Sequence, residues 1–388
     1  MNRNELIFCG LGGGGSRLVD TIMTTDPRFA GYFINTSMTD IESLENYNEL
    51  TKNFFCISTS NGVGRNRVLG KSFAKQSGYS IIDMIERFNQ DTIYFTATLG
   101  GGSGSALISE LLSALEKMKS DPESDFKKTI NVIAILPDLN SPTVILKNAK
   151  DTWNEIIKYK CVNSIIFVNN NCKLEEDFES NNDKELRINE IFAETFTSIF
   201  DIPLINGINF DNGNLSNILH DKGCLYFYTL PDDCTSVEIA MSKAERNSIL
   251  GKMYRNDNNT VVEKDKEGKE NKLIKCGYLG VSFVDEDYNK KFITSKYKPY
   301  KEPYIGENAD RNLVLVSGCL PPYNDIKVIE LEIEEREKEN ANRNNVDFST
   351  FALNTANNES AVGETINTVE DRKNNKKKSI KKVKRGLF

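Results

Sequence analysis

The sequence predicts an α/β protein with a parallel sheet, a second α/β domain and a flexible C-terminal tail. Three observations support this fold class. Short apolar segments alternate with helical patterns over the first 180 residues. Two glycine runs each stand between a strand-like segment and a helix-like one, and the alternation becomes less regular after residue 180. Strands that alternate with helices form parallel sheets covered by helices on both faces, as in Rossmann-type domains.

The first half of the chain contains six strand candidates and four helix candidates. The strands are expected at residues 5–12, 32–35, 54–57, 92–98, 130–136 and 164–168. The helices are expected at residues 16–25, 71–89, 105–119 and 147–159. Ile81, Ile82, Ile85 and Phe88 recur at helical spacing, whereas the mostly apolar segment at 130–136 is stopped by Pro137.

A long helix at 183–201, with an apolar stripe and a stop at Pro203, separates this half from the rest. After a loop at 206–214, the pattern gives strands at 224–230, 276–284 and 312–319, a helix at 236–254, a hydrophilic loop at 255–272 and a charged helix at 330–339. The predicted organisation is a nucleotide-binding domain (1–182), a central helix (183–203), a second α/β domain (204–325), a charged helix (326–339) and a linker with a basic tail (340–388).

The 388 residues carry a formal charge of −7, but this charge is unevenly distributed. Residues 372–388 contain nine lysines and arginines and no acid, so residues 1–371 carry −16. No segment approaches the roughly 20 apolar residues of a membrane span, and no signal peptide is apparent at the start. Eight scattered cysteines and one histidine argue against a disulfide framework or a multi-histidine metal site. We therefore expect a cytoplasmic protein without a membrane partner.

The two glycine runs are the strongest functional signal. Residues 10–15 and 100–104 each follow a strand and open a helix, where glycine permits close approach of phosphate oxygens to backbone N–H groups. Gly10, Gly12 and Gly15 also satisfy GxGxxG, so an NAD-binding enzyme is an alternative. Residues 35–37 lack the acid that this motif pairs with the ribose, and a second glycine run has no place in it.

The segment Gly100-Gly-Gly-Ser-Gly-Ser105 resembles the GGGTGTG signature of the tubulin/FtsZ superfamily, with serine for threonine at two positions. Further segments resemble this family's loops in the same order along the chain. They are residues 10–17, 35–36, 62–66, 137–143, 169–171 and 209–214. The resemblance implies a GTPase that binds GTP or GDP with Mg²⁺, for which no protein ligand is assigned.

The resemblance also assigns roles to single residues. The nucleotide-binding set is Gly12, Gly13, Gly14, Ser16, Arg17, Asn35, Gly64, Arg65, Asn66, Gly100, Gly101, Gly102, Ser103, Gly104, Ser105, Asn171 and Phe192. Phe192 is either a base-stacking residue or part of the core. The catalytic set is Asp211, Asn209 and Asn214, with Asn214 standing where FtsZ has a second acid. In this family the catalytic loop completes the site of the next subunit, so hydrolysis requires a head-to-tail filament.

The basic tail distinguishes between members of the family. It is similar to the tails by which plasmid-partition members engage a DNA-bound adaptor, and differs from the short adaptor-binding peptide of FtsZ. We therefore expect dynamic filaments that segregate plasmid or phage DNA, with an adaptor bound by residues 372–388 and DNA contacted indirectly. The alternatives are an FtsZ-like division or phage-positioning filament, a scaffold that binds GTP without turnover, and a tail that only keeps filaments apart.

Overall fold

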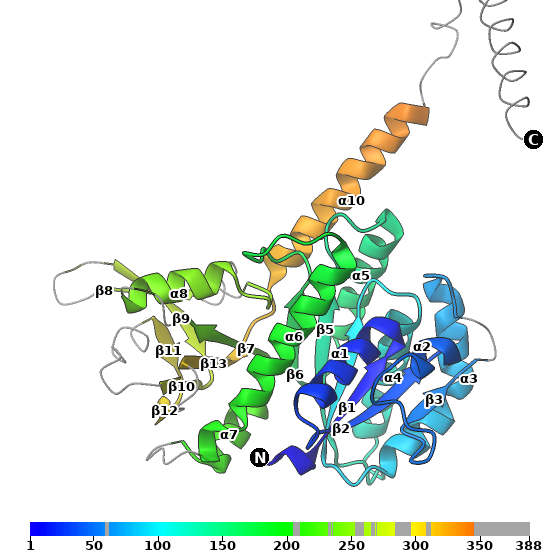
Figure 1. The fold of residues 1–388 in the computed structure, drawn as a ribbon, viewed down its shortest axis with the longest axis horizontal. Coiled ribbons are helices and arrows are strands. Elements are labelled where there is room, and N and C mark those ends of the chain that lie inside the picture. Colours follow the sequence, from blue (N-terminus) through cyan, green and yellow to red (C-terminus); the bar gives the residue numbers. More distant parts are fainter. Residues whose placement is uncertain are drawn as a thin grey trace, which may run out of the picture. The chain divides into compact units, whose positions relative to one another are not determined.

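The computed structural model describes residues 1–58, 62–204, 210–231, 234, 236–252, 260–264, 268, 270–283, 296–307 and 312–344. Within this range, residues 1–336 belong to one compact unit (Figure 1). Asn209 and the tail at 372–388 lie outside the described residues.

A ten-stranded sheet in the order β12-β10-β13-β7-β6-β5-β4-β1-β2-β3 forms the centre of this unit. The six N-terminal strands are β1 (Leu6–Leu11), β2 (Ala30–Asn35), β3 (Phe54–Cys56), β4 (Thr92–Thr98), β5 (Thr129–Leu136) and β6 (Val162–Asn169). They pair in parallel, and β1 and the apolar stretch of β5 are buried almost throughout. The predicted α/β fold with a parallel sheet is confirmed.

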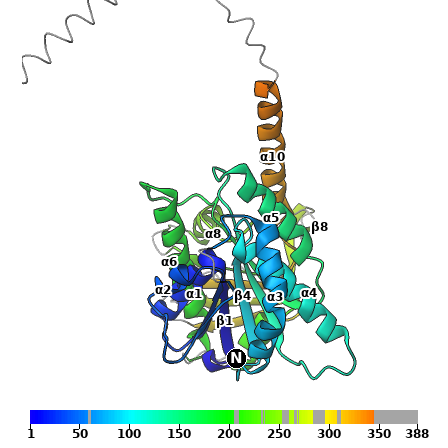
Figure 2. The ribbon, with the colours of Figure 1, turned by 90° about the vertical axis from the view of Figure 1, so that its right-hand side faces the viewer.

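Helices cover both faces of this sheet. They are α1 (Gly12–Thr25), α2 (Met38–Glu42), α3 (Arg67–Glu86), α4 (Ser103–Ser120), α5 (Thr143–Ile156) and α6 (Asn181–Ile199). Helix α1 packs against α6 on one face, whereas α3, α4 and α5 pack in series on the other (Figure 2). Trp153 on α5 and Phe192 on α6 are both buried in the core that these layers share with the strands.

The C-terminal half extends the same sheet. Strand β7 (Gly223–Leu230) pairs in parallel with β6, and β13 (Asn312–Cys319) pairs antiparallel with β7. Strand β10 (Leu279–Phe283) pairs antiparallel with β13 and in parallel with β12 (Tyr304–Glu307). Strands of both halves belong to this one hydrogen-bonded sheet, so the sheet itself marks no boundary between domains. The domain boundaries at residues 182 and 204 remain predictions.

Several predicted elements of the C-terminal half have different bounds. Helix α8 (Val237–Arg246) ends well before residue 254, because Leu250 instead forms a bridge with Val168 of β6. The sequence predicts a loop at 255–272, but the described residues 260–264 form β8 (Thr260–Lys264) and residues 270–272 begin β9 (Glu270–Cys276). These strands form a second sheet with β11 (Tyr297–Pro299). Strands β8 and β9 follow each other in the chain and pair antiparallel, and their mixed polar composition leaves no apolar periodicity to detect.

The segment predicted as a loop at 206–214 opens helix α7 (Asn212–Leu219). The charged helix is longer than predicted, because α10 spans Tyr323–Asn344. Its first part packs on the body through Ile326, Ile329 and Ile333, which are buried. A spacing of three and four residues places these three side chains on one face of the helix.

Candidate nucleotide-binding site

The candidate site lies where three adjacent strands end. Strands β5, β4 and β1 are neighbours in the sheet, and each is followed by a helix: α5, α4 and α1. A cavity of about 300 Å³ lies at this edge. Its lining is formed by Gly13, Gly14, Arg17, Arg65, Thr98, Gly100, Gly101, Gly102, Ser103, Gly104, Ile135, Leu136, Pro137, Ser141, Ile145, Asn170 and Glu185. In open parallel sheets, ligands bind at the carboxyl ends of the strands.

The two glycine runs contact each other through their backbones. Gly12 has φ +68°, and a Cβ placed there would lie 2.5 Å from the backbone nitrogen of Gly104. A Cβ on Gly104 would in turn lie 2.6 Å from the carbonyl oxygen of Leu11. The hydroxyls of Thr36 and Ser103 are hydrogen-bonded at 2.6 Å beside this contact. The runs therefore need glycine for their own packing as well as for close approach of a ligand.

The helices that open at the cavity have no side-chain cap. The residues that precede α1, α4 and α5 are Leu11, Gly102 and Pro142, and none of them accepts a hydrogen bond from the first turn through its side chain. By contrast, side chains cap α2, α3, α6, α7 and α8. Uncapped N–H groups and the positive end of the helix dipole make an anion-binding site.

Positive charge reinforces this arrangement. Arg17 and Arg65 both line the cavity and are exposed to solvent. Arg65 has φ +68°, a conformation that is uncommon for a residue other than glycine and often marks functional sites. Within the described ranges no three histidine, cysteine or acidic side chains are grouped to hold a metal ion.

The other end of the cavity offers hydrogen-bonding groups suited to a base. Asn170, Glu185 and Asn189 surround a small adjoining cavity. The Oδ1 atom of Asn170 is buried and has no hydrogen-bond partner. Burial raises the pKa of Glu185 above its ordinary value, and the nearby charge of Arg17 offsets part of this effect. Buried polar atoms are normally satisfied, so a bound ligand is a natural partner for Asn170.

The structure places the residues of the predicted nucleotide set in three groups. Those that line the cavity are Gly13, Gly14, Arg17, Arg65, Gly100, Gly101, Gly102, Ser103 and Gly104. Those that adjoin it in the same loops and helices are Gly12, Ser16, Gly64, Asn66 and Ser105. Asn35 ends β2 outside the lining, where its Nδ2 donates to Asp40 at 3.1 Å. Several of these support the loops: Asn66 caps α3 through Leu69, and the hydroxyls of Ser16 and Ser105 bond to backbone carbonyls of the glycine runs.

Two further residues of the predicted set, Asn171 and Phe192, do not line the cavity. Asn171 accepts a hydrogen bond from the Leu139 backbone, and its neighbour Asn170 lines the cavity instead. Phe192 is fully buried. Its ring stacks on that of Phe196, with 5.6 Å between the ring centroids, and meets the ring of Phe227 edge-on, so Phe192 is a core residue. Sequence reasoning missed Glu185 and Asn189, whose four-residue spacing at the start of α6 places them on one helix face.

The predicted catalytic residues Asp211 and Asn214 form a capping box at the start of α7. Each side chain accepts a hydrogen bond from the other residue's backbone nitrogen at 2.8 Å. Asn212 shares a surface hollow with residues 2–4, directly before β1, whereas the cavity lies after the last residue of β1. Six strand residues span about 20 Å. Asp211 and the cavity are therefore at opposite ends of β1.

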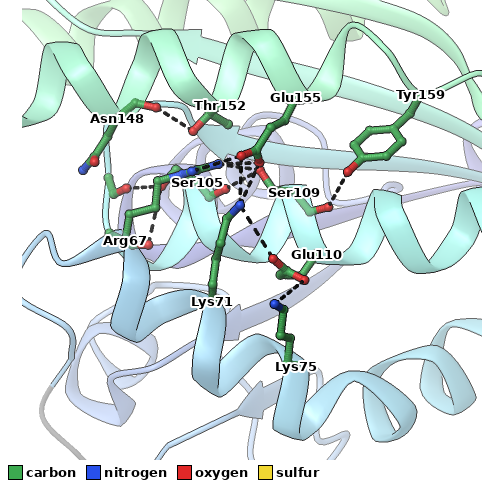
Figure 3. A network of polar contacts seen from close by, with 12 residues as sticks. Arg67, Lys71, Lys75, Ser105, Ser109, Glu110, Asn148, Thr152, Glu155 and Tyr159 are labelled. Atoms are coloured by element: carbon green, nitrogen blue, oxygen red, sulfur yellow. Dashed lines mark hydrogen bonds and ion pairs between the residues drawn. The ribbon is translucent and has the colours of Figure 1, made fainter.

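A polar network stabilises the loops from behind the cavity (Figure 3). Arg67 and Lys71 of α3 form ion pairs with Glu155 of α5 at 2.6 and 2.9 Å. Burial alone would raise the pKa of Glu155, but hydrogen bonds from Arg67, Ser109 and Lys71 outweigh it and hold that pKa at about 2. This network fixes α3 against α5 and thereby the loop that ends at Asn66.

The buried Asn148 of α5 connects two cavity loops directly. Its side-chain Nδ2 donates to the carbonyl oxygens of Arg65 and Gly100, both at 3.2 Å. A larger hollow of about 410 Å³ lies between α6, β7 and α8, but its lining includes no glycine. The smaller cavity, with its glycine runs, helix N-termini and arginines, is the one equipped for phosphates.

The comparisons with known proteins agree with this site. Residues 5–177 match the model of the Tubulin/FtsZ family, GTPase domain. Over 373 residues the chain is 24% identical to the tubulin-like protein TubZ of Clostridium botulinum C phage. This alignment covers 93% of the present chain and 92% of that protein.

Solved structures show the same fold. The crystal structure of TubZ from Clostridium botulinum phage c-st matches with a TM-score of 0.70 at 23% identity, covering 87% of this chain and 99% of that one. A GTPγS-form protofilament of TubZ from Bacillus thuringiensis serovar israelensis matches with a TM-score of 0.65 at 13% identity, covering 88% and 94%. No helix in the described part of the chain is long and apolar enough to cross a membrane.

Proposed function

We propose that this chain is a tubulin-like protein that binds GTP in the cavity described above, polymerises head to tail and hydrolyses GTP between subunits. The observation that carries the proposal is the convergence of three uncapped helix N-termini on one cavity. Their N–H groups and the side chains of Arg17 and Arg65 would hold the phosphates. Asn170, Glu185 and Asn189 would contact the base.

Hydrolysis needs a group that polarises the attacking water. The described residues that line the cavity include one acid, Glu185, at the base end. Asp211 is exposed at the opposite end of β1 and would supply its carboxylate to the cavity of the next subunit. The capping box orients Asp211. The Asn214 side chain accepts a hydrogen bond from the Asp211 backbone nitrogen, and the Asn214 backbone nitrogen donates to Oδ1 of Asp211. Asn209 belongs to the same proposed loop. Bound Mg²⁺ would supply neutralisation of the phosphate charge.

Exposed apolar side chains near both ends fit a contact between copies of the chain. Val68, in the first turn of α3 next to Arg65, is 81% exposed, and Val144, in the first turn of α5, is 47% exposed. At the other end, Leu204 is 63% exposed and shares a hollow with Asn212. Exposed apolar side chains at two different faces fit a head-to-tail contact, which generates filaments when it does not close into a ring.

The rate of GTP hydrolysis against protein concentration tests this proposal, with pelleting measured in parallel. The rate per molecule should be near zero below a threshold concentration and rise together with pelletable polymer. Asp211→Ala should still bind GTP and pellet, but its hydrolysis should fall by about 100-fold or more. A rate per molecule that is independent of concentration would show a self-contained active site and overturn the shared-site proposal.

We further propose that the filaments segregate plasmid or phage DNA through a DNA-bound adaptor. This rests on the sequence of residues 372–388, whose nine cations follow a body of charge −16. Such a body repels DNA, so a cationic tail is the segment suited to a partner bound to DNA. Truncation after Glu370 should leave polymerisation unchanged and abolish co-pelleting of adaptor–DNA complexes. Equal co-pelleting by truncated filaments would exclude this role of the tail.

A further inference from the structure

Helix α10, which leads toward the basic tail, contacts the loop that closes one side of the nucleotide cavity. This loop, residues 137–142, joins β5 to α5, and its Pro137 and Ser141 line the cavity. Arg336 of α10 donates through Nη1 to the carbonyl oxygen of Ser141 at 2.6 Å and through Nη2 to that of Leu139. A single planar guanidinium thus bridges two backbone carbonyls of the loop.

The guanidinium is itself oriented. Its Nε donates to Oε1 of Glu332, one turn earlier in α10, at 2.6 Å. The side chains of Arg336 and Glu332 are 24% and 29% exposed, so water screens these contacts only in part. The buried stripe of Ile326, Ile329 and Ile333 fixes this part of α10 on the body.

The loop is held from a second side by α6. Lys184 forms an ion pair with Asp138 at 2.8 Å, and Asp138 is only 5% exposed. The backbone of Leu139 also donates to Asn171 at 3.5 Å, the longest of these contacts. Arg336 thus joins the cavity loop to α10, as Lys184 joins it to α6.

We propose that Arg336 is a positioning residue for nucleotide binding and couples the docking of α10 to occupancy of the cavity. This inference rests on the proposed function, because it takes the cavity as the GTP site. A loop already fixed in its bound arrangement loses less conformational entropy when the nucleotide binds, so removing the bridge weakens binding. Linkage is reciprocal, and bound nucleotide must then stabilise the docked α10.

The test measures the affinity of the full-length chain for a fluorescent GTP analogue below the polymerisation threshold. Arg336→Ala should raise Kd by about 5- to 20-fold, since two charge-assisted hydrogen bonds are lost. Arg336→Lys should give an intermediate value, because one ammonium cannot reproduce the planar fork. Glu332→Gln should give a smaller increase. The matched control is Lys150→Ala, which removes the 3.5 Å ion pair of α5 with Glu330 of α10 without touching the loop.

Hydrogen exchange supplies a readout that a merely structural role would not move. GTP should slow exchange of the α10 backbone amides at 326–336 in the wild type and in Lys150→Ala, but not in Arg336→Ala. An unchanged Kd in Arg336→Ala, or an equal loss in Lys150→Ala, overturns the inference. Arg17→Glu separates this from the larger proposal: if it binds GTP as the wild type does, the cavity itself is not the site. If Arg17→Glu loses GTP binding and Arg336→Ala does not, the cavity remains the proposed GTP site and the proposed role of Arg336 is excluded.

Discussion

Asn148 provides a sharp test of how the cavity is held together. Its side chain joins the loop that contains Arg65 to the second glycine run at Gly100, with two hydrogen bonds of 3.2 Å. Asn148 is 8% exposed, so water has little access to replace those bonds in a truncated variant. Asn148→Ala would leave two cavity-facing loops without their common donor.

The size of the effect follows from the two carbonyls. Each hydrogen bond contributes about 1 kcal/mol net, and the buried carbonyl of Gly100 adds a desolvation cost when it loses its partner. If bound nucleotide must restore the order of both loops, the binding free energy of Asn148→Ala is weaker by about 2 kcal/mol. This corresponds to about a 30-fold increase in Kd. Asn148→Asp should be worse, since a carboxylate would face two carbonyl oxygens.

The assay is titration of a fluorescent GTP analogue below the polymerisation threshold, with thermal unfolding measured on the same samples. Thr152→Val is the matched control, because Thr152 is buried one turn further along α5 and bonds the carbonyl of Asn148, not the loops (Figure 3). A Kd for Asn148→Ala within twofold of the wild type would refute the reasoning. So would an equal loss in Thr152→Val, since that would locate the effect in helix α5.

Three further predictions address the core, the polar network and the glycine contact. Phe192→Ala should lower the free energy of unfolding by about 3 to 5 kcal/mol in denaturant titrations while the Kd for GTP stays near that of the wild type; a large rise in Kd with unchanged stability would instead mean base stacking. Because folding lowers the pKa of Glu155 to about 2, its stabilising contribution is complete above about pH 4.5 and declines as the pH falls toward 2. The difference in Tm between the wild type and Glu155→Gln should therefore shrink over that range, and a difference that is constant with pH would contradict the network. Gly12→Ala should raise Kd by at least about tenfold, because φ +68° and a Cβ at 2.5 Å from Gly104 both strain the contact; a normal Kd would show that the two glycine runs can separate.

Local patterns in the sequence determine much of the N-terminal half. The strands there are mostly apolar segments, as in β1 and β5, and each glycine run stands at a strand end. The α/β alternation and a phosphate-binding edge can therefore be predicted without tertiary information. Helix bounds shift by a few residues because glycine-rich turns such as 12–15 are already helical in the structure. The basic tail at 372–388 is likewise a property of composition alone.

Packing between distant segments decided the rest. Phe192 has the same local pattern whether it faces a base or the core, and only its position against Phe196 and Phe227 distinguishes the two. Glu185 and Asn170 become a pair at the cavity because α6 crosses beside the end of β6, and Arg336 reaches the loop at 137–142 from nearly 200 residues away. A sequence specifies the periodicity and chemistry of each segment locally, but which groups meet depends on burial of apolar faces from the whole chain, and that is settled only when the segments pack together.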